Sequence, residues 1–142
     1  MYKNIVVGTD GSRRADRAIS DAAALARLSS AKLHIVQGCG HPVVMADAHA
    51  GLAVTHLQET IDLVSRGLEE VAAQIRESGI EVDVHATGSS GHSALCGVAE
   101  EVGADLIVVG NRGMTGASRF LGSVPNAVSH QAPCSVLILA TD

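Results

Sequence analysis

Aromatic side chains are almost absent from this sequence, whose 142 residues include one Tyr, one Phe and no Trp. Proteins that bind single-stranded nucleic acid stack the bases on several aromatic rings, so this class is excluded. Lys and Arg number 10 against 15 Asp and Glu, and the resulting formal net charge of -5 disfavours DNA and anionic membranes as partners. With so few rings available, we expect an aliphatic core of Val, Ile, Leu and Ala.

Long hydrophobic runs and paired cysteines are also missing. No apolar stretch approaches the roughly 18 residues of a membrane-spanning helix, and the first apolar run is too short for a signal peptide. Cys39, Cys96 and Cys134 form no Cys-x-x-Cys pattern, so we expect three reduced thiols, two of them buried. We therefore expect a cytoplasmic protein, and the lack of repeats and linkers indicates one domain over residues 1–142.

The sequence does contain an alternation of two hydrophobic periods. Short β-branched runs predict strands over residues 4–8, 32–36, 80–86, 105–109 and 134–140. Helical spacing predicts helices over residues 15–26, where Ser12 is the expected N-cap, and over 56–75, 93–102 and 123–131. The segments 38–50 and 110–122 are expected to be loops. Strands that alternate with helices in this way predict an α/β fold with an open, five-stranded parallel sheet covered on both faces.

Gly-rich segments follow the first and the fourth predicted strands. They are Gly8–Ser12 and Gly110–Gly113, and in a sheet of order 3-2-1-4-5 both lie at the same crevice, at the carboxyl ends of the strands. The second segment continues to Gly122 and Ser123, where a short helix begins whose free amides favour an anion. Its glycines permit left-handed backbone and close approach, so this segment can bind phosphate. A flexible connection is the structural alternative.

Three further groups of residues have weaker signals. Arg13, Arg14 and Arg17 open the first helix, where cations oppose the helix dipole; either an anion lies nearby or they form a solvated face. The histidines lack the spacing of a metal site, so we expect no metal. Residues 89–93 contain Ser and His without a Gly-x-Ser-x-Gly elbow, and Ser90 or Ser93 is expected to cap the following helix. We expect no catalytic residue among them.

Three segments carry a resemblance to a known family. They are residues 7–12 (VGTDGS), residues 104–113 (ADLIVVGNRG) with Gly122-Ser-Val124, and residues 131–138 (QAPCSVLI). On these segments the chain resembles the universal stress protein family along essentially its whole length. The resemblance implies a Rossmann-like sheet of order 3-2-1-4-5, similar to adenine nucleotide alpha hydrolases, and a homodimer through the last strand, Cys134–Ala140.

The resemblance also implies a set of nucleotide-binding residues. Thr9, Asp10 and Gly11 match the segment near adenine and ribose, and the backbone from Val36 to Gly38 matches the segment at the adenine edge. The phosphate-holding positions are Gly110, Asn111, Arg112, Gly113, Gly122, Ser123 and Val124. The ATP-binding branch has nine residues between its second and third glycines, and this sequence has eight. For Asp10 a structural alternative exists, because an Asp in such a turn often bonds nearby backbone amides.

These matches imply a stress-response module that binds ATP as a regulatory ligand, with AMP or a cyclic nucleotide as alternatives and Mg²⁺ as the ion that accompanies ATP. The sequence has no P-loop lysine and no evident general base, so we expect no efficient enzyme. A slow ATPase and a nucleotide-free dimeric interaction protein remain open. A response-regulator receiver is rejected, because the third strand ends in His85-Ala-Thr-Gly-Ser89 without the required Asp.

Overall fold

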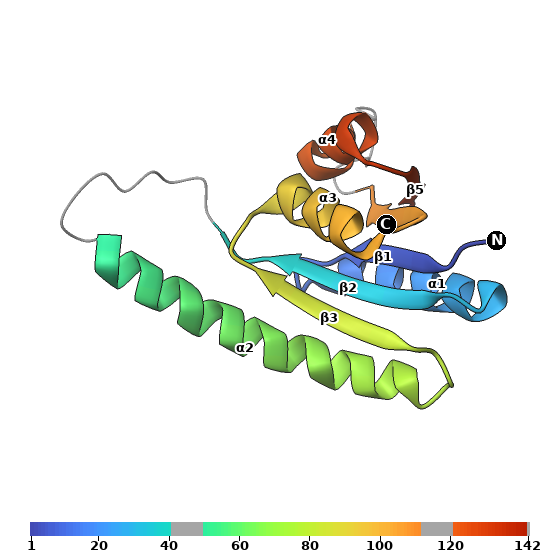
Figure 1. Cartoon of the computed structure of the whole chain (residues 1–142), viewed down its shortest axis with the longest axis horizontal. Coiled ribbons are helices and arrows are strands. Elements are labelled where there is room, and N and C mark those ends of the chain that lie inside the picture. Colours follow the sequence, from blue (N-terminus) through green and yellow to red (C-terminus); the bar gives the residue numbers. More distant parts are fainter. Residues whose placement is uncertain (41–49, 112–120, 142) are drawn as a thin grey trace.

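The computed structural model describes residues 1–40, 50–111 and 121–141, in which strands and helices alternate (Figure 1). The strands are β1 (Asn4–Gly8), β2 (Lys32–Gly38), β3 (Val82–Thr87), β4 (Leu106–Gly110) and β5 (Ser135–Leu139). The helices are α1 (Arg13–Ser29), α2 (Ala50–Arg76), α3 (Gly91–Val102) and α4 (Ser123–Gln131). Over the described part of the chain, no helix combines the length and the apolar character needed to cross a membrane.

The five strands form one parallel sheet of order β3-β2-β1-β4-β5. This order confirms the predicted fold class. The chain reverses its winding direction between β1 and β4, which are paired with Val7 opposite Val108. Their carboxyl ends therefore lie side by side in the middle of the sheet, which is where parallel α/β folds bind ligands.

Helices cover both faces of the sheet, with α1 and α2 on one face and α3 and α4 on the other (Figure 1). Alternate residues of each strand point to opposite faces, so Ile5 and Val7 pack against α1 and α2 while Val6 faces α3. The largest fully buried side chains are all Ile, Leu or Val, as the scarcity of aromatics predicts.

The helix ends follow local capping chemistry. The Ser12 hydroxyl accepts a hydrogen bond from Ala15 N, which confirms its predicted role as the N-cap of α1. Gly103 closes α3 in a left-handed conformation with φ 63°. Ser90 is the N-cap residue of α3, but its side chain makes no capping bond. The amides at the start of α3 therefore lack the side-chain cap that α1 has.

The structure corrects some predicted element boundaries and the predicted burial of the cysteines. Helix α2 begins at Ala50 rather than near residue 56. Gly51 and Thr55 have low helix propensity, so the sequence pattern predicted a later start, but they do not end the helix. The strand β2 continues two residues further than predicted, to Gly38. All three thiols are free, but only Cys39 is buried; Cys96 and Cys134 are half-buried. Burial raises the pKa of each thiol above its ordinary value.

Candidate functional site

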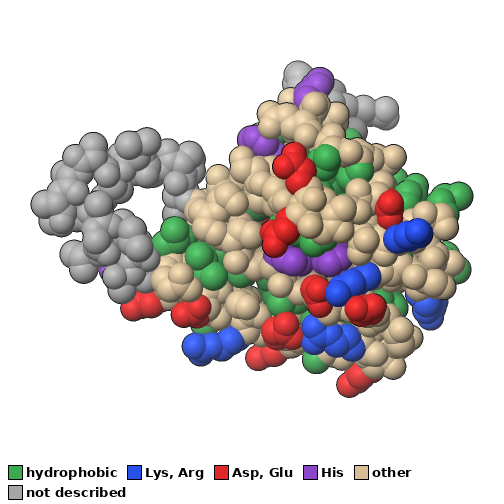
Figure 2. All heavy atoms as spheres, in the orientation of Figure 1, with side chains coloured by type: hydrophobic (Ala, Val, Ile, Leu, Met, Phe, Trp, Pro, Cys, Tyr) green, Lys and Arg blue, Asp and Glu red, His purple; other side chains and the backbone are tan. Residues whose placement is uncertain are grey.

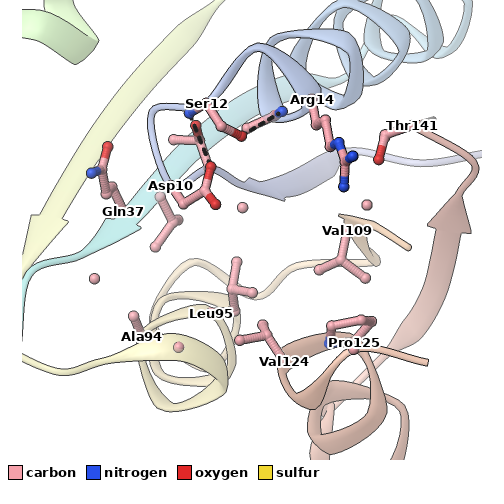
Figure 3. Close-up of a pocket in the computed structure, with 18 of the residues that line it drawn as sticks. Asp10, Ser12, Arg14, Gln37, Ala94, Leu95, Val109, Val124, Pro125 and Thr141 are labelled. Atoms are coloured by element: carbon pink, nitrogen blue, oxygen red, sulfur yellow. Dashed lines mark hydrogen bonds between the residues drawn. The ribbon is translucent and has the colours of Figure 1, made fainter. Parts of the chain in front are cut away.

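A cavity of about 860 Å³ opens at the carboxyl ends of β1, β2 and β4 (Figure 3). This volume is in the range of small-molecule sites. The described residues that line the cavity come from the strand ends, from the first turns of α1, α3 and α4, and from the segment after β5. They are Gly8, Thr9, Asp10, Ser12, Arg13, Arg14, Ala15, Val36, Gln37, Gly38, Gly91, Ala94, Leu95, Val109, Gly110, Gly122, Ser123, Val124, Pro125 and Thr141.

Most of the predicted nucleotide-binding residues meet at this cavity. Those that line it are Thr9, Asp10, Val36, Gly38, Gly110, Gly122, Ser123 and Val124. Gly11 and Asn111 are described but are not part of the lining. Arg112 and Gly113 lie outside the described residues. The two Gly-rich segments thus converge where the strand order predicts.

The turn after β1 is held by side chains that bond its own backbone. The Oγ1 of Thr9 accepts a hydrogen bond from Gly11 N at 3.1 Å, and the Oδ1 of Asp10 accepts one from Ser12 N at 3.0 Å. Gly11 has φ +81°, a conformation that favours glycine. Asp10 therefore has the structural role considered for it, and its carboxylate also lines the cavity (Figure 3). The two roles are compatible.

The end of β4 is fastened to the segment after β5 by Asn111. Its backbone N–H donates to the carbonyl of Leu139 at 2.8 Å. Its Oδ1 accepts from the backbone N–H of Thr141 at 3.0 Å and from the Thr141 hydroxyl at 3.3 Å. Asn111 and Thr141 are each only 6% exposed. Asn111 thus positions Thr141 at the cavity without lining the cavity itself.

The reason for glycine at position 110 differs from the expected one. A Cβ on Gly110 would lie 3.1 Å from two side-chain atoms of Thr141, so the glycine makes room for a neighbouring residue of the protein. Neither Gly110 nor Gly122 adopts the left-handed backbone that the Gly-rich pattern allowed: Gly110 has no positive φ, and Gly122 has φ -58°. Close packing of the strand ends therefore explains Gly110.

Three helix N-termini point their partial positive charge at the cavity. Arg13 and Gly91, the first residues of α1 and α3, both line it, as does Ser123, the first residue of α4. The N-cap of α4 is Gly122, which has no side chain to bond the first-turn amides. Pro125 has no N–H, so Ser123 and Val124 carry the amides that face this end of the helix. Such an arrangement favours an anionic ligand.

Several lining residues were not predicted as binding residues. They are Gly8, Ser12, Arg13, Arg14, Ala15, Gly91, Ala94, Leu95, Val109, Pro125 and Thr141, whereas Gln37 lies within the predicted segment from Val36 to Gly38. The unfavourable placement of cations at the start of α1 was a signal for Arg13 and Arg14. Leu95 and Thr141 reach the cavity through tertiary packing, which no local pattern reveals. In residues 1–40, 50–111 and 121–141, no group of three His, Cys, Asp or Glu could hold a metal ion.

Comparison with known proteins gives consistent results. The model of the universal stress protein family matches residues 1–140. A Staphylococcus haemolyticus protein whose name places it among the universal stress proteins is 31% identical, over 99% of this chain and 86% of its own length.

Two solved structures share the fold and contain ligands. A universal stress protein in complex with cAMP is 31% identical with a TM-score of 0.71, covering 99% of this chain and 98% of its own. The universal stress protein from Archaeoglobus fulgidus in complex with dAMP is 27% identical with a TM-score of 0.62, covering 96% of this chain and 97% of its own. The fold, the convergence of both Gly-rich segments on one cavity, and these matches agree: the chain belongs to the universal stress protein family.

Proposed function

We propose that this protein is a stress-response module that binds an adenine nucleotide, ATP in particular, in the cavity at the ends of β1, β2 and β4. The observation that carries the proposal is the convergence of three helix N-termini and both Gly-rich segments on one cavity. The solved relatives with cAMP and dAMP support adenine as the base.

The lining offers a distinct environment to each part of the nucleotide. At the β2 end, Val36 and Gly38 present backbone to the edge of the adenine, and Leu95 of α3 supplies apolar contact. The carboxylate of Asp10 accepts hydrogen bonds from the ribose hydroxyls. The first-turn amides of Ser123 and Val124 bind the phosphate oxygens. Mg²⁺ accompanies ATP as its counterion.

The proposed role is regulatory binding without efficient turnover. The described lining holds no Lys and no His, and its single carboxylate, Asp10, bonds the backbone of its own turn. Efficient phosphoryl transfer needs a group that orients the attacking water. This residue set favours a bound nucleotide that acts as a signal.

We further propose that the protein acts as a cytoplasmic homodimer. The strand β5 is an edge of the sheet, and Leu137 on this strand is 38% exposed. An apolar edge strand invites pairing with another chain. Three free thiols are consistent with a reducing compartment.

Native mass spectrometry of the freshly purified protein tests the binding proposal, since a bound nucleotide appears as added mass. Calorimetric titration with ATP then gives the affinity. We expect Gly122→Val to abolish binding, because an isopropyl group at this lining position takes up the space beside the first-turn amides of α4. The far-UV circular dichroism should stay native.

Gly67→Val is the matched control, because Gly67 is exposed on α2 and an added Cβ would have no atom within 4 Å beyond its chain neighbours and the backbone of its own helix. It should bind ATP like the wild type. Wild-type affinity in folded Gly122→Val would refute the phosphate assignment. Absence of nucleotide from the purified protein, together with no heat of ATP binding, would instead favour the nucleotide-free interaction protein.

A further inference from the structure

Arg14 extends a cationic side chain into the cavity. It is the second residue of α1, and Figure 3 shows its guanidinium directed towards the space beside Val109 and Thr141. The side chain is exposed, and it forms no ion pair with a carboxylate in the part of the chain that the structure describes. A guanidinium with five donors is therefore available to a ligand in the cavity.

Asp10 and Arg14 lie at different places along the cavity (Figure 3). In Figure 3 the labelled polar side chains follow one another as Gln37, Asp10, Ser12, Arg14 and Thr141 from the β2 side to the β5 side. The acidic group lies nearer the β2 end, where the adenine and ribose are placed in the proposed function. The guanidinium lies at the opposite end, beyond the ribose. The two ends thus suit different parts of one nucleotide.

The position of Arg14 opposes the dipole of its own helix, and Asp16 is the acidic residue in the same turn. Cations in the first turn oppose the helix dipole, and α1 begins with Arg13 and Arg14 in succession. These two are the cations among the described lining residues, in a chain with a net charge of -5. An anionic group in the cavity would attract both arginines and would offset their unfavourable interaction with the helix dipole.

The first turn of α4 lies across the cavity from Arg14. Figure 3 shows Val124 and Pro125 on the opposite wall, below the guanidinium. The amides of Ser123 and Val124 in this turn have no capping side chain. An anionic group between the two walls would receive donors from both sides, because the amides offer fixed dipoles and the guanidinium offers charge.

We infer that Arg14 is a specificity-determining residue that selects nucleotides by the length of their phosphate chain. It contacts the distal phosphates of a nucleoside polyphosphate. A nucleoside has no phosphate to present, and the phosphate of a cyclic monophosphate is tied to the ribose, at the Asp10 end. This inference rests on the proposed function and adds the ligand class that the same site prefers.

Calorimetric titration of the wild type, Arg14→Gln and Arg17→Gln with adenosine, AMP and ATP tests the inference. Gln keeps a polar side chain and removes the charge. Arg17 is the matched control, one turn further along α1 and outside the cavity lining. We expect Arg14→Gln to weaken ATP binding about tenfold, as the loss of one charge-assisted contact predicts, and to change adenosine binding less than about twofold. Arg17→Gln should match the wild type for all three ligands.

Each outcome decides between the two proposals. Unchanged ATP affinity in Arg14→Gln, or an equal loss for adenosine and ATP, would overturn the inference while leaving nucleotide binding established. An equal loss of ATP affinity in Arg17→Gln would show a general effect of charge and would also overturn it. A wild type that binds none of the three ligands would overturn the proposed function, and the inference with it.

Discussion

Asn111 ties two neighbouring strand ends together with a single buried side chain. The backbone N–H and the hydroxyl of Thr141 both donate hydrogen bonds to Oδ1 of Asn111. The backbone N–H of Asn111 donates to the carbonyl of Leu139. Buried polar groups are costly unless they are bonded, and in the described residues every buried side-chain N or O atom has a partner. Asn111 therefore stabilises the β4–β5 end of the cavity.

Asn111→Ala should lower the free energy of unfolding by about 1–3 kcal/mol, because it removes the acceptor and leaves the Thr141 N–H buried without a partner. Thr141→Val should cost less, because the backbone N–H keeps its bond to Oδ1 and only the longer hydroxyl bond is lost. Urea denaturation measures both values. A Thr141→Val cost equal to that of Asn111→Ala would show that Oδ1 does not hold the backbone.

The residues of the site divide into those with a local signal and those without. Thr9, Asp10 and Ser123 were predictable, because each lies in a Gly-rich segment directly after a strand or at a helix start. Leu95 reaches the cavity only because α3 packs across β1 and β2. Thr141 reaches it only because Asn111 holds it there. Contacts between segments distant in sequence carry no local pattern, so these residues could not be predicted.

Three strands are linked by a row of polar side chains across the sheet. His34 of β2 is 3% exposed, and its Nδ1 lies 3.1 Å from Nε2 of His85 on β3. Its Nε2 lies 3.2 Å from Oδ1 of Asn4, at the start of β1. Because a carbonyl oxygen only accepts, Nε2 of His34 carries a proton, and Nδ1 of the neutral ring accepts from His85. Protonation of His34 at Nδ1 removes this acceptor.

Charged residues neighbour this pair along the two strands: Nζ of Lys32 lies 2.7 Å from Oδ2 of Asp83 and 3.2 Å from Oε1 of Glu81. Figure 2 shows acidic, basic and histidine side chains on one face of the molecule. Burial is the main cause that lowers the pKa of His34, and His85 and Lys32 lower it further. Asp83 and Glu81 act in the opposite direction but do not outweigh burial. The net effect is a native state that binds a proton less readily than the unfolded chain.

The protein should lose stability as the pH falls below about 6.5, the ordinary pKa of histidine. The unfolded chain takes up the proton there, while folded His34 takes it up only at lower pH, so acid favours unfolding. The slope from this group should be at most about 1.4 kcal/mol per pH unit, and it should vanish above pH 7.5. Denaturation in urea at several pH values between 5 and 8 measures it.

Variants separate His34 from other titrating groups. His34→Gln should flatten the pH dependence in this range, whereas His130→Gln, at an exposed position on α4, should retain it. Hydrogen bonds from Lys32 hold the pKa of Asp83 below its ordinary value, so this carboxylate loses its stabilising effect only below about pH 4. An unchanged slope in His34→Gln would assign the pH dependence to another group.

Element types were predictable from hydrophobic period, and the helix α4 has the predicted bounds, residues 123–131. Element boundaries were harder to predict where the hydrophobic patterns of helix and strand both weaken. The predicted strand began at Ile80, and β3 begins at Val82, because the chain turns at Gly79 with φ +86° before it joins the sheet. Ile80 is nevertheless buried in the core. A buried residue beside a strand is not distinguished from a strand residue by its hydrophobicity.

At the scale of the whole molecule, β5 is an edge strand of the sheet. The carbonyl of Leu139 accepts a bond from Asn111 on the β4 side. In a strand the N–H and C=O of one residue point to the same side, and successive residues alternate. The backbone groups of Val136 and Ile138 therefore point away from β4. These are the groups that would pair with a second copy in the proposed dimer.

Ile138→Pro tests the dimer at this edge. The proline removes an N–H that does not bond to β4, so it should spare the sheet of the protomer and prevent antiparallel pairing between two copies. We expect the wild type to sediment as a dimer at micromolar concentration and Ile138→Pro to sediment as a monomer or to aggregate. Ile138→Ala keeps the N–H and shortens the side chain, so it should remain dimeric. If Ile138→Pro stays a dimer, the interface lies elsewhere; if Ile138→Ala dissociates as well, side-chain packing rather than the backbone ladder holds the two copies together.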